Sequence, residues 1–195
     1  MSDTKNFSLY QRQKVTKPLI EDTIPEYLDG DRKNAALDFA AYMRANRMKP
    51  AWSLTNKWKA VYRGKAICNI CISTCDEKGY HRGYYARPGA AASWYINPYL
   101  THMEAYKDII MSEGLQDLVW NSAFRCVYSG ESPSPGVGCS PDKPCAPGGV
   151  ITVLGKEIEH NCCNHLSLLM WNPDEAALRG IETLLELEKR AREGT

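Results

Sequence analysis

Cysteine, proline and glycine crowd into one stretch of this chain and limit what it can fold into. Five of the eight cysteines lie between Cys126 and Cys163. Within this stretch, residues 129–149 contain five prolines and five glycines. Proline fixes φ and has no N–H to donate, so regular secondary structure is excluded there. Residues 129–149 are predicted to form a long loop that, if ordered, is held by a metal, a disulfide or packing.

A zinc ion is one candidate for holding this loop, because zinc takes four nitrogen or sulfur ligands. Cys139 and Cys145 bracket the loop with a C-x5-C spacing, wider than the usual C-x2-4-C. In an extended segment His160 and Cys162 would share a face. Cys126 or Cys163 could replace one ligand, and free thiols or a disulfide stay open as alternatives. The candidate metal ligands are Cys139, Cys145, Cys162 and His160.

Three other cysteines, Cys68, Cys71 and Cys75, form a C-x2-C-x3-C pattern, of which the first two lie inside the predicted strand 65–72. Side chains three residues apart in a strand point to opposite faces, so Cys68 and Cys71 could not share an ion. Small buried thiols are the better interpretation of this group.

The charge balance argues against a nucleic-acid or anionic-membrane surface, since Lys and Arg total 24 and Asp and Glu total 23. The polar start of the chain has no secretory signal pattern, and no apolar run is long enough to span a membrane. A reducing cytoplasmic location is therefore expected, in which cysteines are thiols or metal ligands before they are disulfides.

Hydrophobic periodicity and turn residues divide the chain into an N-terminal arm, residues 1–30, and a single α+β domain, residues 31–195. The arm has weak periodicity and is expected to be extended over the domain or partly disordered. An Arg63–Gly64 turn predicts a hairpin. The predicted strands are 57–62, 65–72, 80–87, 149–154 and 166–171. The predicted helices are 31–48, 101–114, 115–124 and one that starts near Pro173.

Capping residues mark two of these helices. Thr101 with Glu104 has the form of a capping box. Asn172 is expected to cap the last helix, whose apolar stripe is predicted to be buried. That stripe comprises Leu178, Ile181, Leu184 and Leu185. Three basic residues, Lys189, Arg190 and Arg192, are expected at its solvated C-terminal end.

The strand segments are short and joined by turns, and no strand–helix–strand rhythm occurs. The expected fold is therefore α+β, with an antiparallel sheet and helices packed on one side. The same order of elements is compatible with two similar helix-plus-sheet halves.

Aromatic residues that carry a polar group are unusually frequent. The chain has five Trp and eleven Tyr but only three Phe. Such rings are favoured where a site must bury a ring and keep a hydrogen bond, and they hold flat or cationic compounds. Ordinary core packing is the alternative. The candidate ligand-binding residues are Trp52, Trp58, Tyr62, Tyr85, Trp94 and Tyr95.

The order of elements, with Trp58 and Tyr62 on a hairpin, resembles small bacterial domains of the gyrase-inhibitor-like and YdhG-like type. This resemblance implies a curved sheet that can hold a small ligand. The last third of the chain, with Leu154-Gly155-Lys156-Glu157 and Asn172-Pro173-Asp174 before a Leu-rich helix, resembles uncharacterised Cys-rich proteins of clostridial bacteria. A shared fold does not fix a function.

The function expected from these observations is binding of a small aromatic or cationic molecule in an aromatic-lined pocket. A hydrolase or thiol-dependent enzyme that uses the same cleft is the alternative, with Cys163 near His160 or His165 as a candidate nucleophile. A third alternative is an interaction protein stabilised by a metal. The common nucleotide-binding and hydrolase motifs are missing from the sequence.

Overall fold

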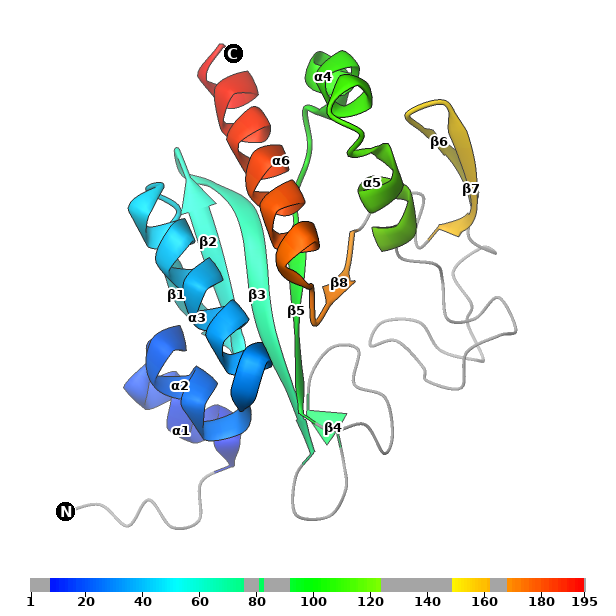
Figure 1. The fold of residues 1–195 in the computed structure, drawn as a ribbon. Helices are drawn as coiled ribbons and strands as arrows, with labels where there is room; N and C mark the ends of the chain where they lie inside the picture. The colour runs from blue at the N-terminus through cyan, green and yellow to red at the C-terminus, as the bar shows by residue number, and fades with distance from the viewer. Residues whose placement is uncertain (1–7, 76–80, 83–91, 124–148, 162–167, 195) are drawn as a thin grey trace, which may run out of the picture. The chain divides into compact units, whose positions relative to one another are not determined.

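The structure is a computed structural model that describes residues 8–75, 81–82, 92–123, 149–161 and 168–194 (Figure 1). The chain forms two compact units, Met1–Tyr95 and Ile96–Thr195. Both units contain helices, and the pairings β1–β2, β2–β3, β3–β4 and β6–β7 are antiparallel. The predicted α+β class is therefore confirmed. Apart from Gly149, the predicted loop 129–149 lies outside the described residues.

The first unit begins with three helices, α1 (Leu9–Thr16), α2 (Ile20–Tyr27) and α3 (Gly30–Ala45). The expectation of an extended or disordered arm was wrong for α1 and α2. A capping box starts α1, since the Ser8 hydroxyl accepts from Gln11 N and the Gln11 side chain accepts from Ser8 N. In α2, Ile20 and Ile24 are fully buried, one helical turn apart.

A single buried glutamine attaches α1 to the sheet. The Gln13 amide nitrogen donates to Asn56 Oδ1 at 2.6 Å. Its oxygen accepts from Asn56 N at 2.8 Å and from Trp52 Nε1 at 3.3 Å. Gln13 is the one buried residue of α1, so hydrogen bonds rather than an apolar stripe hold this helix in place.

Helix α3 matches the predicted helix 31–48 and packs through its apolar stripe. Ala36, Phe39, Ala40 and Met43 follow at helical spacing and are buried. The helix ends at Ala45, and Arg47 then adopts a positive φ of 63° before β1 begins. Figure 1 shows α2 and α3 in front of the strands of this unit.

The sheet of the first unit has the strand order β1-β2-β3-β5, and β4 also pairs with β3. The Arg63–Gly64 turn joins β2 to β3 with both residues at positive φ, as a two-residue hairpin requires, so the predicted hairpin is confirmed. The boundary between the two units lies within β5. The strands are β1 (Pro50–Leu54), β2 (Lys57–Tyr62), β3 (Lys65–Cys75), β4 (His81–Arg82) and β5 (Ser93–Pro98).

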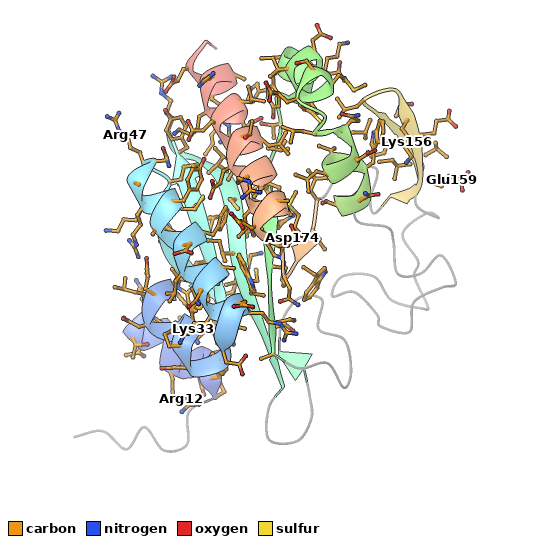
Figure 2. The ribbon with its side chains drawn as sticks, viewed as in Figure 1. Arg12, Lys33, Arg47, Lys156, Glu159 and Asp174 are labelled. Atoms are coloured by element: carbon orange, nitrogen blue, oxygen red, sulfur yellow. The ribbon has the colours of Figure 1, made fainter. Side chains whose placement is uncertain are left out.

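The second unit contains short helices, a hairpin and one long helix. Its elements after β5 are η2 (Met103–Tyr106), α4 (Lys107–Ser112), α5 (Gln116–Ser122), β6 (Gly149–Val153), β7 (Lys156–Asn161), β8 (Met170–Trp171) and α6 (Glu175–Glu193). Strand β8 lies next to β5. The β6–β7 hairpin is tied to α5, because Trp120 Nε1 donates to the Val153 carbonyl at 2.8 Å. Lys156, labelled on the hairpin in Figure 2, lies over the Trp120 ring.

Helix α6 buries the predicted stripe of Leu178, Ile181, Leu184 and Leu185. Its cap differs from the prediction. The cap is Asp174, whose carboxylate accepts from Ala177 N at 2.8 Å (Figure 2). Asn172, the expected cap, has a positive φ of 40° in the preceding turn. Among the described helices none is both long and apolar enough to cross a membrane.

We expect the Gln13→Ala substitution to destabilise the first unit by about 1–3 kcal/mol, because the buried Asn56 N–H and amide oxygen would each lose their hydrogen bond to Gln13. Arg12→Ala is the matched control, since Arg12 is exposed on the same helix (Figure 2). Its effect should stay within about 0.5 kcal/mol. Urea unfolding followed by tryptophan fluorescence measures both. Equal midpoints for the two variants would show that Gln13 does not hold α1.

Candidate functional site

One face of the first unit's sheet is covered by helices. Cross-strand pairing places Trp58 opposite Ile70 on this face. The Trp58 indole nitrogen donates to the Pro18 carbonyl, between α1 and α2, at 2.9 Å. On β5 the Trp94 ring lies 6.2 Å from the Phe39 ring of α3. These contacts define the helix-covered face.

The opposite face carries polar side chains. Because side chains alternate along a strand, β3 points Asn69, Cys71 and Ser73 away from the helices. On β5, Ser93 and Tyr95 alternate with Trp94, and a side-chain hydrogen bond joins Tyr95 to Cys71. None of these side chains is more than 7% exposed. We call this set, Asn69, Cys71, Ser73, Ser93 and Tyr95, the polar sheet face.

The two serines of the polar sheet face are its most informative members. Within the described part of the chain, neither Ser73 nor Ser93 makes a side-chain hydrogen bond. A serine hydroxyl can both donate and accept a hydrogen bond, whereas alanine at the same place could do neither. The face therefore holds hydrogen-bonding groups that a bound molecule could satisfy.

Two lysines flank the polar sheet face on β2. Lys57 pairs with Cys71, and Lys59 pairs with Asn69. Lys57 is half-buried and Lys59 is exposed, so the face passes from solvent at β2 to full burial at β3. The side nearest to solvent is thus positively charged.

The Cys71 thiol on this face is unreactive at neutral pH. Burial raises the pKa of Cys71 to about 11, although the hydrogen bond with Tyr95 and the charge of Lys57 oppose the shift. The thiolate is the reactive form of cysteine, so Cys71 does not supply a nucleophile at neutral pH. Cys68 is also a buried free thiol. Cys68 and Cys71 point to opposite faces, as predicted, because no bulge interrupts β3 between them.

The structure divides the predicted ligand-binding aromatic residues between the two faces. Trp58 and Trp94 lie on the helix-covered face, and Trp52 and Tyr62 share it, because Trp52 pairs with Trp58 and Tyr62 alternates with it. Tyr95 lies on the polar sheet face. Tyr85 is outside the described residues. The described rings therefore do not line a single site. The sequence signal that could have revealed the polar sheet face is the alternation of Asn69, Cys71 and Ser73 along β3.

The predicted zinc site cannot be assembled from the described residues. Cys139, Cys145 and Cys162 lie outside them, as do Cys126 and Cys163, and His160 belongs to β7. Among the described residues no three metal-binding side chains of the His, Cys, Asp or Glu type gather in one place. Zinc binding by the Cys-rich segment stays a prediction.

The second unit contains a buried carboxylate that sequence patterns did not single out. Glu188 of α6 is fully buried and accepts five hydrogen bonds. The Thr101 hydroxyl, His102 Nδ1, the Tyr106 hydroxyl and Arg192 Nε each donate at 2.8 Å. His102 N donates at 3.0 Å. We call these five residues the Glu188 network.

The Glu188 network corrects two expectations. Thr101 was expected to cap a helix, but its hydroxyl donates to Glu188 and the following 3-10 helix η2 has no side-chain cap. Arg192 was expected at a solvated helix end, but it is buried, and its Nη2 also donates to the Tyr99 carbonyl at 3.1 Å. A buried charge requires such pairing. Glu188 lies one helical turn before Arg192, whereas the Tyr99 carbonyl is 93 residues away and is brought close only by the fold.

The surroundings of Glu188 and Tyr106 fix the protonation state of each group. Burial alone would raise the pKa of Glu188, but hydrogen bonds from His102, Arg192 and Thr101 outweigh it and lower the pKa to about 2. Burial, together with the charge of Glu188 and its hydrogen bond, raises the pKa of Tyr106. Glu188 is thus a carboxylate and Tyr106 a neutral donor across the neutral pH range.

We expect the second unit to lose about 3 kcal/mol of stability between pH 4.5 and pH 2. A carboxylate whose pKa is lowered on folding, here from 4.5 to about 2, contributes stability that is complete above the unfolded pKa and is lost as the pH falls through the folded pKa. Urea unfolding at a series of pH values measures this dependence.

Glu188→Gln should be destabilised by about 3–5 kcal/mol at pH 7, since it removes the carboxylate that pairs with the buried Arg192, and should show a flatter acid dependence. Glu186→Gln on the same helix is the control, because its partly exposed i,i+3 pair with Lys189 contributes at most about 1 kcal/mol. An acid dependence of Glu188→Gln as steep as that of the unmodified protein would contradict this account.

Comparison of the chain with protein-family models, with curated proteins and with solved structures finds no match in any of the three. The resemblance to gyrase-inhibitor-like domains therefore stays a prediction, and the assignment of function depends on the site geometry alone.

Proposed function

We propose that this protein binds a small aromatic molecule and that the polar sheet face is its binding surface. The observation that carries the proposal is a pair of serines, Ser73 and Ser93, which are at most 7% exposed and whose hydroxyls make no hydrogen bond within the described residues. Small-molecule sites combine buried apolar or aromatic surface with a few polar groups that fix the ligand's orientation. Tyr95 supplies a ring two residues from Ser93 on β5, where it is hydrogen-bonded to Cys71.

Neutral and negatively charged ligands suit this face better than cationic ones. The polar sheet face consists of an amide, a thiol, two serine hydroxyls and a phenol, none of which carries charge at neutral pH. The charged groups paired with it across β2 are Lys57 and Lys59. A cation would be repelled by these lysines, and the described residues of this face include no carboxylate to hold it. Of the two ligand classes expected from the sequence, the aromatic one is favoured.

The remaining predicted aromatic residues have a supporting role in this proposal. Trp58 and Trp94 pack between the sheet and the helices and hold β2 and β5 in position. Strands that are already rigid lose less conformational entropy when a ligand binds to them. The free thiols Cys68 and Cys71 are consistent with the proposed cytoplasmic, reducing location.

A matched series of ligands tests the proposal: a naphthoate, the corresponding naphthamide and the corresponding naphthylmethylamine, which share a ring system and differ in charge. Calorimetric titration should show that the acid and the amide bind and that the amine binds weakest. Ser73→Ala should weaken the acid and the amide by about fivefold to tenfold, the value of one hydrogen bond. Lys59→Ala should weaken the naphthoate by more than the naphthamide.

Ser53→Ala is the control variant, because the Ser53 hydroxyl on β1 already donates to the Lys57 carbonyl. It should bind all three compounds like the unmodified protein. Amide chemical shifts should change at residues 69–73 and 93–95 and remain constant in α3. Binding that favours the amine, or an unchanged affinity in Ser73→Ala, would contradict the proposed site.

A further inference from the structure

His102 of the second unit is an imidazole held at one edge by a carboxylate. It precedes η2, and its side chain is 28% exposed while that of Glu188 is fully buried. Its Nδ1 lies 2.8 Å from Glu188 Oε1 and 3.1 Å from Thr101 Oγ1. Within the described part of the chain its other ring nitrogen, Nε2, makes no hydrogen bond.

The hydrogen bonds determine which ring nitrogen carries the proton. Glu188 is ionised, so its oxygens only accept. The Thr101 hydroxyl donates its single proton to Glu188 Oε1, so its oxygen can only accept from the ring. Both neighbours of Nδ1 are therefore acceptors, and Nδ1 must be the donor. In the neutral imidazole Nε2 then carries the lone pair.

We propose that His102 is a general base, oriented by Glu188, which activates water for the hydrolysis of activated acyl esters. This activity is separate from ligand binding on the polar sheet face. An imidazole whose Nδ1–H is held by a carboxylate is fixed in tautomer and orientation, which is the role of the carboxylate in hydrolytic triads. Water is the nucleophile, because the Thr101 proton is committed to Glu188.

The choice of substrate class follows from what surrounds His102. Its two described polar neighbours, Thr101 and Glu188, lie at Nδ1 rather than at Nε2. Described side chains therefore do not supply an oxyanion hole at Nε2, and the acyl group must be activated by its own leaving group. Arg192 balances the charge of Glu188, which suits an uncharged ester.

The proposed step is balanced in atoms and protons. Nε2 takes a proton from water as the water oxygen bonds to the acyl carbon. The bond from that carbon to the leaving oxygen then breaks, and the alcohol departs with the proton from Nε2. One ester and one water become one acid and one alcohol. Nδ1 keeps its proton on Glu188 throughout.

Hydrolysis of p-nitrophenyl acetate by the full chain, with exposed thiols first blocked by iodoacetamide, tests the proposal. His102→Asn is the informative variant, because the asparagine amide can replace the Nδ1–H bond to Glu188 while the basic Nε2 is lost. We expect it to lower the rate above background by roughly tenfold or more.

His81→Asn is the matched control, since His81 lies on β4 of the first unit, and it should keep the full rate. An NMR spectrum that correlates ring nitrogens with carbon-bound protons should report the Nδ1–H tautomer for His102. The proposal is overturned by hydrolysis no faster than background, by an undiminished rate in His102→Asn, by an equal loss in His81→Asn, or by an Nε2–H tautomer.

Discussion

The burial of β3 on both of its faces is the constraint on which the first unit depends. This strand is bonded to β2 on one edge and to β5 on the other, so its backbone groups are satisfied within the sheet. Toward the helices it presents Cys68, Ile70 and Ile72, all at most 1% exposed. Apolar burial of this kind contributes about 25 cal/mol per Å². The stability gained on that face allows the other face to hold polar groups at a cost.

The three N-terminal helices complete the apolar face and depend on polar contacts to do so. Helix α1 is joined to the sheet through Gln13, and the segment between α1 and α2 accepts a hydrogen bond from Trp58. An ion pair between Glu21 and Arg44 connects α2 to α3. The helices thus close one side of the sheet and leave ligand recognition to the polar sheet face, where each hydroxyl is positioned by the backbone of a paired strand.

How far the sequence predicts this fold depends on how each element is stabilised. Helices α3 and α6 and the β2–β3 hairpin were predicted because their own periodicity and turn residues specify them. Helix α1 was missed because its buried residue is Gln13, which leaves no hydrophobic pattern to read. The Glu188 network was missed for another reason: its partners Tyr106 and Thr101 are 82 and 87 residues away from Glu188. Only the fold brings these residues together.

In the candidate ligand site, too, the sequence predicts some features and the fold alone creates others. The aromatic residues were found by composition, but composition does not record the face on which a side chain lies. Strand alternation separates Trp94 from its neighbour Tyr95. The polar residues that define the face, Asn69, Ser73 and Ser93, are common residue types with no motif, and their meaning comes from their burial.

Equilibrium unfolding of Ser73→Ala and Ser93→Ala without ligand tests the central claim most directly. If these hydroxyls serve a ligand rather than the fold, their removal takes no hydrogen bond from the fold, and both variants should keep the unfolding free energy of the unmodified protein to within about 0.5 kcal/mol. Ser53→Ala, which loses a hydrogen bond that the fold does make, should be less stable by about 1 kcal/mol. Destabilisation of Ser73→Ala and Ser93→Ala by as much as Ser53→Ala would show that the polar sheet face serves the fold, and the ligand-binding account would be wrong.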